Sequence, residues 1–78
     1  MYTEAEAKRR LGAILSVEER FDSVDWQEVA RQSAALLQEL PPGLPEIVET
    51  YLTELDKRKA DTAFAYAQRT ELLRFLRS

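Results

Sequence analysis

The residues of this chain that could do chemistry are mostly carboxylates, and they are densest around one expected helix junction. These acids are Glu18, Glu19, Asp22, Asp25 and Glu28. Paired carboxylates can act as general acid and base when burial separates their pKa values. Here they fall on helix faces that are expected to meet solvent. The pattern therefore predicts an acidic, solvated surface with helix caps, and no catalytic pair.

Other reactive groups lack the partners that their chemistry requires. The chain has no histidine and no cysteine, so the commonest general base, thiolate metal ligands and disulfides are all absent. Its serines therefore have no imidazole to activate them. Gly12 and Gly43 are its two glycines, too few for a glycine-rich phosphate loop. The acids match no calcium loop. We expect no catalytic residue, metal or cofactor, and no enzymatic activity.

Basic side chains form two clusters, Lys8 to Arg10 and Lys57 to Lys59, and further arginines follow the second cluster. Cations at the carboxyl end of a helix stabilise its dipole, which is a purely structural interpretation of the second cluster. The functional interpretation is a face that contacts nucleic-acid phosphates without reading base sequence. Its candidate contacts are Lys57, Lys59, Arg69 and Arg74.

Three aromatic residues, Trp26, Phe64 and Phe75, are the candidates for binding a partner. Trp26 follows an expected helix start, where it is either a core anchor or an interface hot spot of the kind in which tryptophan is enriched. Phe64 and Phe75 belong to an apolar arc that covers roughly half of the last expected helix. Such an arc is expected to contact more than one neighbour.

Hydrophobic periodicity places all these residues on helices. The expected helices cover about 4–21, 24–39, 45–58 and 62–77. No run alternates apolar with polar residues, so no strand is predicted.

Helix boundaries are indicated by capping residues. Thr3 and Glu6 fit a capping box at the first start. Ser23 and Asp61 are candidate caps for the second and fourth helices. Neither glycine nor proline interrupts residues 46–78, so one long helix is the alternative to the last two.

All three prolines of the chain lie in the segment Leu-Pro-Pro-Gly-Leu-Pro at residues 40–45. Residues 1–40 carry eight acids and five bases, whereas residues 41–78 carry six of each. We expect one domain, 1–78, made of an acidic helical hairpin (1–40), a linker (41–45) and a charge-balanced hairpin (46–78). No internal repeat is clear enough to use.

The predicted fold is all-α, a small four-helix bundle of two antiparallel hairpins joined by the proline-rich linker. Its expected core is Leu11, Ile14, Leu15, Trp26, Val29, Leu36, Leu37, Ile47, Val48, Leu52, Leu55, Tyr66, Leu72 and Leu76. A core of 78 residues supplies a margin of only about 3–5 kcal/mol, which favours extra stabilisation by a partner or by self-association.

After the linker, an apolar stripe begins at Leu44, Thr62 is followed four residues later by Tyr66, and residues 72–77 read Leu-Leu-Arg-Phe-Leu-Arg. Residues 44–77 resemble the start of the amino-terminal core-binding, SAM-like domain of tyrosine recombinases (phage integrases). The loop before Thr62 is shorter, and the distance from Tyr66 to Phe75 longer, than in that family.

The resemblance implies a bacterial or phage protein whose helical domain clamps DNA in recombination. The recombination chemistry would need a separate carboxyl-terminal domain, which this chain does not contain. The chain would then be a fragment or a stand-alone relative. Lys57, Lys59, Arg69 and Arg74 would contact phosphates.

We expect a non-catalytic helical interaction module that binds a protein partner or itself, as an adaptor, inhibitor or assembly factor. The alternative is the DNA-binding domain that the resemblance implies, although an acidic chain is a poor generic binder of nucleic acid. Neither a secretory signal nor an apolar run of about 18 residues is present. A cytoplasmic protein without membrane or small-molecule substrate is therefore expected.

Overall fold

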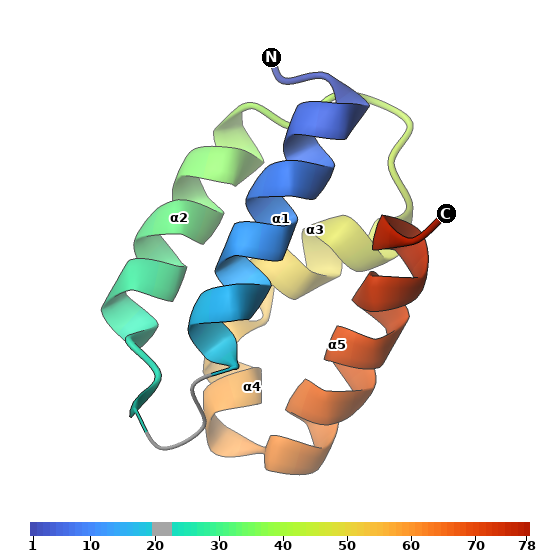
Figure 1. Cartoon of the computed structure of the whole chain (residues 1–78). Coiled ribbons are helices and arrows are strands. Elements are labelled where there is room, and N and C mark those ends of the chain that lie inside the picture. Colours follow the sequence, from blue (N-terminus) through green and yellow to red (C-terminus); the bar gives the residue numbers. More distant parts are fainter. Residues whose placement is uncertain (20–22) are drawn as a thin grey trace. The chain divides into compact units, whose positions relative to one another are not determined.

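The computed structural model describes residues 1–19 and 23–78. Within these ranges the chain forms helices and no strand, which confirms the all-α fold class. The helices are α1 (Glu4–Glu18), α2 (Trp26–Gln38), α3 (Glu46–Thr53), α4 (Leu55–Ala60) and α5 (Thr62–Leu76) (Figure 1). In the part of the chain that is described, no helix is long and apolar enough to cross a membrane.

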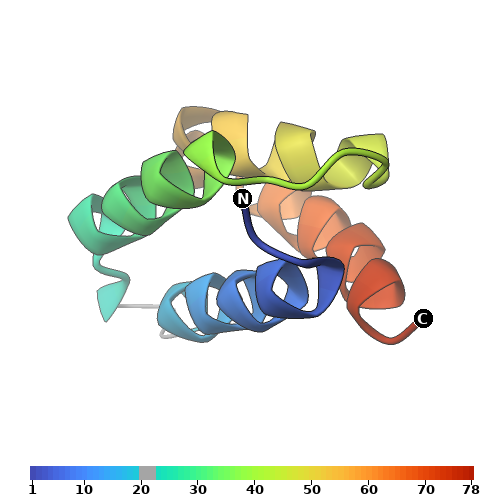
Figure 2. The same cartoon turned by 90° about the horizontal axis from the view of Figure 1, so that it is seen from above.

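The chain divides between Leu44 and Pro45 into two compact units, so the boundary falls at the end of the proline-rich segment. In the first unit, Met1–Leu44, α1 packs against α2, and the two helices run in opposite directions (Figures 1 and 2). In the second unit, Pro45–Ser78, α5 packs against both α3 and α4.

Side-chain caps start three of the helices. The Thr3 hydroxyl accepts the Glu6 amide at 3.2 Å, as the capping box predicts, and Asp61 Oδ1 accepts the Phe64 amide at 3.1 Å. The cap of α2 is Asp25, whose Oδ1 accepts the Glu28 amide at 3.1 Å, so the prediction of Ser23 is wrong. Both are good cap residues, and Asp25 starts the helix at Trp26.

The amino terminus is held against Glu39, the residue that caps the carboxyl end of α2. The Tyr2 amide donates to the Glu39 carbonyl at 2.8 Å, and the Met1 ammonium lies 2.7 Å from the Glu39 carboxylate. The hydrogen bond and charge of that ammonium lower the pKa of Glu39. Gly43 follows with φ of +86°, a left-handed conformation that glycine adopts without strain.

The boundaries of the first helix and the linker differ slightly from prediction. The predicted helix 4–21 is helical from Glu4 to Glu18, and its predicted last two residues, 20 and 21, lie outside the described residues. Pro45 caps α3 instead of being its first residue. Proline has no amide hydrogen to contribute, so either position suits it.

The predicted third helix, 45–58, is two helices, because the backbone bends at Glu54 (φ −101°, ψ 34°). In an unbroken helix the Tyr51 carbonyl would accept the Leu55 amide. Here Arg58, only 2% exposed, donates to that carbonyl from Nη1 and to Gln68 Oε1 at 2.8 Å. With this bend, the Arg58 side chain is buried. It caps the carboxyl end of α3 at the Tyr51 carbonyl and forms a hydrogen bond with Gln68 of α5.

Aromatic and amide groups complete the surroundings of Arg58. Its guanidinium lies 3.9 Å from the centre of the Tyr51 ring, a cation–π contact with a fully buried aromatic residue. Gln68 Nε2 donates in turn to Glu54 Oε2 at 3.4 Å. We call Tyr51, Glu54, Arg58 and Gln68 the Arg58 network. It joins α3, α4 and α5, and it replaces the purely apolar core that periodicity predicts.

Much of the predicted core is confirmed: Leu11, Ile14, Leu15, Val29, Leu36, Val48, Leu52 and Leu72 are buried. Five other predicted core residues are only half-buried, because a helix in so small a unit covers a narrow stripe of its neighbour: Trp26, Leu37, Ile47, Leu55 and Leu76. Tyr66 is 70% exposed, so its core assignment is wrong. It lies about 160° around α5 from the buried Gln68.

Replacement of Arg58 tests the importance of the network. Arg58→Ala leaves the Tyr51 carbonyl and the Gln68 amide oxygen without this donor, and we expect the free energy of unfolding to fall by about 3 kcal/mol. Lys59→Ala, an exposed neighbour in α4, is the matched control and is expected to change it by less than about 0.5 kcal/mol. Urea unfolding followed by circular dichroism measures both. Equal free energies of unfolding for the two variants would show that the Arg58 network does not stabilise the fold.

Ser33 generates a second stability prediction. Its hydroxyl is buried in α2 and has no hydrogen-bond partner among the described residues. We expect Ser33→Ala to raise the free energy of unfolding by about 1 kcal/mol more than Ser16→Ala does. The exposed Ser16 hydroxyl already donates to the Gly12 carbonyl at 3.1 Å, so its loss brings no equivalent relief. Thermal unfolding of the two variants decides between these outcomes.

Candidate functional site

The second unit has a groove of about 720 Å³ between α3 and α5. The residues Glu46, Ile47, Thr50 and Glu54 line it from α3 and its end. Residues of α5 form the other wall: Phe64, Tyr66, Ala67, Gln68, Thr70, Glu71 and Arg74. Positions 46, 50 and 54 recur every four residues, so they share one face of α3. We call this the α3–α5 groove.

The lining of the α3–α5 groove combines apolar surface with an excess of negative charge. Ile47 and Phe64 are half-buried, and Tyr66 is one of the most exposed large side chains. Carboxylates at Glu46, Glu54 and Glu71 outnumber the single lining guanidinium, that of Arg74. The groove thus offers aromatic contact area beside carboxylates that attract cations.

The three aromatic residues predicted to bind a partner belong to different units. Trp26 is half-buried at the start of α2, in the first unit. Phe64 and Phe75 are both half-buried on α5, and eleven residues of helix place them only about 20° apart. Of the three, Phe64 lines the α3–α5 groove.

The predicted phosphate contacts also lie in different environments. The Lys57 ammonium is 4.5 Å from the centre of the Phe64 ring, and Lys59 is exposed on α4. Arg69 and Arg74 are about 140° apart around α5, so they do not share one helix face. Arg74 instead lines the acidic α3–α5 groove. Contact of these residues with phosphate stays a prediction.

The first unit has a smaller pocket of about 290 Å³ between α1 and α2, in which three arginines gather. Its lining consists of residue pairs that are 22 positions apart in the sequence: Arg9 and Arg31, Arg10 and Gln32, Ala13 and Ala35, Ile14 and Leu36. The helix caps Thr3 and Asp25 have the same spacing. We call this the arginine pocket.

Sequence reasoning misses both the arginine pocket and the repeat behind it. Only some equivalent positions keep the residue type, such as Glu6 with Glu28 and Arg9 with Arg31. Alignment of the two helices on their caps, Thr3 and Asp25, would have shown the repeat. The sequence shows Lys8 to Arg10 as a basic cluster, but Arg31 has no basic neighbour that would mark it as part of a site.

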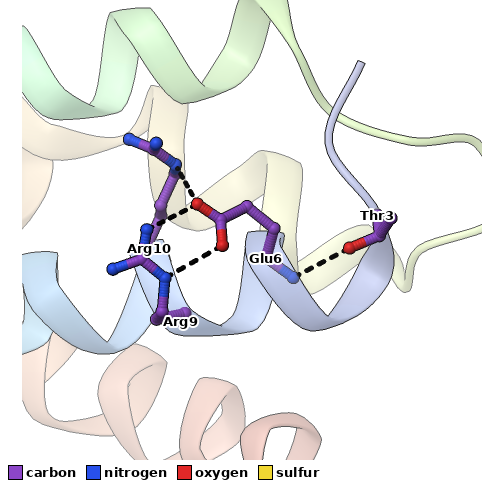
Figure 3. Close-up of polar contacts among 4 residues, drawn as sticks. All are labelled: Thr3, Glu6, Arg9 and Arg10. Atoms are coloured by element: carbon purple, nitrogen blue, oxygen red, sulfur yellow. Dashed lines mark hydrogen bonds and ion pairs between the residues drawn. The ribbon is translucent and has the colours of Figure 1, made fainter.

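Each helix of the arginine pocket holds its arginine against a glutamate one turn earlier. Arg9 donates to Glu6 through Nε at 2.9 Å and Nη2 at 2.5 Å, and Arg10 Nε reaches the same carboxylate at 3.0 Å (Figure 3). Arg31 donates to Glu28 through Nε at 3.0 Å and through Nη2. Gln32 donates to Glu28 at 3.0 Å.

These bonds shift the titration of both glutamates. The hydrogen bonds and charges of Arg9 and Arg10 lower the pKa of Glu6 from 4.5 to about 2. The hydrogen bonds of Arg31 and Gln32, with the charge of Arg31, lower the pKa of Glu28 from 4.5 to about 2. Both carboxylates therefore stay ionised at neutral pH and keep the guanidiniums oriented.

Catalytic or metal chemistry finds no positive support in the described residues. Within 1–19 and 23–78, no group of three or more acidic side chains could hold a metal ion. The described residues do form an acidic groove and a basic pocket, and each includes apolar residues in its lining.

The pairing of Glu28 with Arg31 can be tested by titration. We expect the Glu28 carboxyl group to titrate near pH 2 in the unmodified chain. Arg31→Gln is expected to move the pKa of Glu28 toward 4.5, while the pKa of Glu6 stays near 2. Because a lowered pKa favours the folded state above the unfolded pKa, this stabilisation disappears as the pH falls from about 4.5 to 2. Carbon-detected NMR measures both residues. An unchanged Glu28 pKa in the variant would contradict the assignment.

Comparisons with models of protein families, with curated proteins and with solved structures found no match to this chain. The resemblance of residues 44–77 to tyrosine recombinases therefore stays a prediction.

Proposed function

We propose that this chain is a non-catalytic helical interaction module whose α3–α5 groove binds a basic, amphipathic helical segment of a protein partner. The observation that carries the proposal is the lining of the groove, with three carboxylates and one guanidinium around Ile47, Phe64 and Tyr66. Helical segments commonly bind in grooves through apolar residues spaced three or four positions apart.

The size and chemistry of the α3–α5 groove support this kind of ligand. Its volume of about 720 Å³ has room for several side chains. Phe64 and Ile47 offer apolar contact, and the phenol of the exposed Tyr66 adds a polar edge. Tyrosine is enriched among the residues that dominate binding energy at interfaces.

Charge determines which partner fits the α3–α5 groove. Glu46, Glu54 and Glu71 favour lysine or arginine on the flanks of the bound segment, because complementary charges speed encounter and suppress wrong partners. The same carboxylates repel the phosphates of nucleic acid. A second copy of this chain would have to present a basic helix, and α1 carries Lys8, Arg9 and Arg10 together with Glu4 and Glu6.

The proposal can be tested with a synthetic amphipathic helix that has a leucine stripe and lysine flanks. We expect this dye-labelled probe to bind the full chain in fluorescence polarisation. Glu46→Lys is expected to weaken binding at least tenfold. The matched control Glu49→Lys makes the same charge change on an exposed residue of α3 outside the groove, and should bind almost normally.

Three further measurements can contradict the proposal. A probe with glutamate flanks that binds as well as the lysine probe would exclude charge selection. Duplex DNA that binds at about 50 mM salt and is released at about 200 mM would favour the DNA-binding alternative instead. A dimeric mass in light scattering, lost in Glu46→Lys, would make a second copy the occupant.

A further inference from the structure

The arginine pocket retains donors that the two glutamates do not use. A guanidinium has five N–H donors. Arg9 and Arg31 each use Nε and Nη2 for their own glutamate, so each keeps Nη1 and the second Nη2 hydrogen. These remaining donors form a second fork, the geometry that binds a carboxylate or phosphate through two parallel bonds. Arg10 bonds Glu6 through Nε, and its guanidinium also lies 4.3 Å from the centre of the Tyr2 ring.

The charge of the arginine pocket differs from that of the chain as a whole. The chain has a net charge of −3, yet three guanidiniums face two carboxylates around this pocket. The i to i+3 pairing orients Arg9 and Arg31 before any ligand arrives. An anion would therefore meet ordered donors and a local excess of positive charge.

Apart from the arginines and Gln32, the lining residues are apolar, which restricts the kind of anion. Ala13 and Ala35 are exposed and supply the accessible apolar surface, and the buried Ile14 and Leu36 complete the lining. A bare inorganic ion would leave this apolar surface in water. A ligand that joins an anionic head to a small apolar body would cover it. The pocket volume of about 290 Å³ suits such a small molecule or a single modified side chain.

We propose that the arginine pocket binds a phosphate monoester with a small apolar ester group. Its phosphoryl oxygens bond the forks of Arg9 and Arg31, and its ester group lies against Ala13 and Ala35. A dianionic phosphoryl group offers three terminal oxygens and more charge than a carboxylate, so it can use more than one guanidinium. The site lies in the first unit and is independent of the α3–α5 groove.

Phenyl phosphate is the probe for this site, added to the full chain at about pH 7.5 and low salt. NMR observation of the arginine Nε–H signals is expected to show saturable shifts at Arg9 and Arg31. Inorganic phosphate supplies the head alone and is expected to bind at least fivefold more weakly. Phenol supplies the body alone and is expected to leave these signals unchanged.

Two variants of the pocket and one control variant outside it test where the ligand binds. Arg9→Gln together with Arg31→Gln is expected to weaken phenyl phosphate binding at least tenfold, whereas Arg77→Gln, an exposed arginine of the other unit, leaves it unchanged. Ala35→Glu keeps all three arginines but places a carboxylate in the pocket, and is expected to weaken binding equally. Circular dichroism confirms that each variant is folded.

The proposal has clear contrary outcomes. Absence of saturable shifts at about 10 mM phenyl phosphate would overturn it. So would equal binding of inorganic phosphate, since the anion would then be screening charge without use of the apolar wall. Unchanged affinity in folded Ala35→Glu would also place the ligand elsewhere.

Discussion

The second unit depends on one buried cation. Arg58 has a side chain that is seldom buried. Its partners here include a backbone carbonyl, an amide oxygen and an aromatic face, which offset the cost of burying its charge. Those partners come from α3 and α5, whereas Arg58 belongs to α4. A single guanidinium thus takes the place of a larger apolar core, and it requires the bend at Glu54. The bend also borders the α3–α5 groove, because Glu54 is one of the residues that line it.

The two units place opposite charges in their hollows. The α3–α5 groove is lined mainly by carboxylates, although the bases and acids of its unit are equal in number. The arginine pocket is lined by guanidiniums, although its unit is acidic overall. The net charge of a segment therefore does not indicate the charge that lines its hollow. The local arrangement around each hollow decides which ligands can approach it.

Features that depend on neighbouring residues in the sequence were predictable. Thr3 and Asp61 cap helices as expected, and the prolines separate the units, because caps and proline act on the local backbone. The break at Glu54 was not predictable, because no glycine, proline or cap residue marks it in the sequence. It accompanies the hydrogen bond between Arg58 and Gln68, two residues that are ten positions apart. The arginine pocket was not predictable from the sequence for a similar reason. Arg9 and Arg31 line one pocket only after α1 and α2 have packed together.

The 22-residue repeat has a consequence for how any guest would lie between α1 and α2. Because the helices run antiparallel and present matching residues, the pocket looks almost the same from either side. An elongated guest would therefore find two orientations of similar energy. The pair Arg10 and Gln32 is the one polar difference in the lining, so this single mismatch would break the degeneracy. The preferred orientation of the ligand would then depend on a single position at which the two otherwise matching helices differ in polarity.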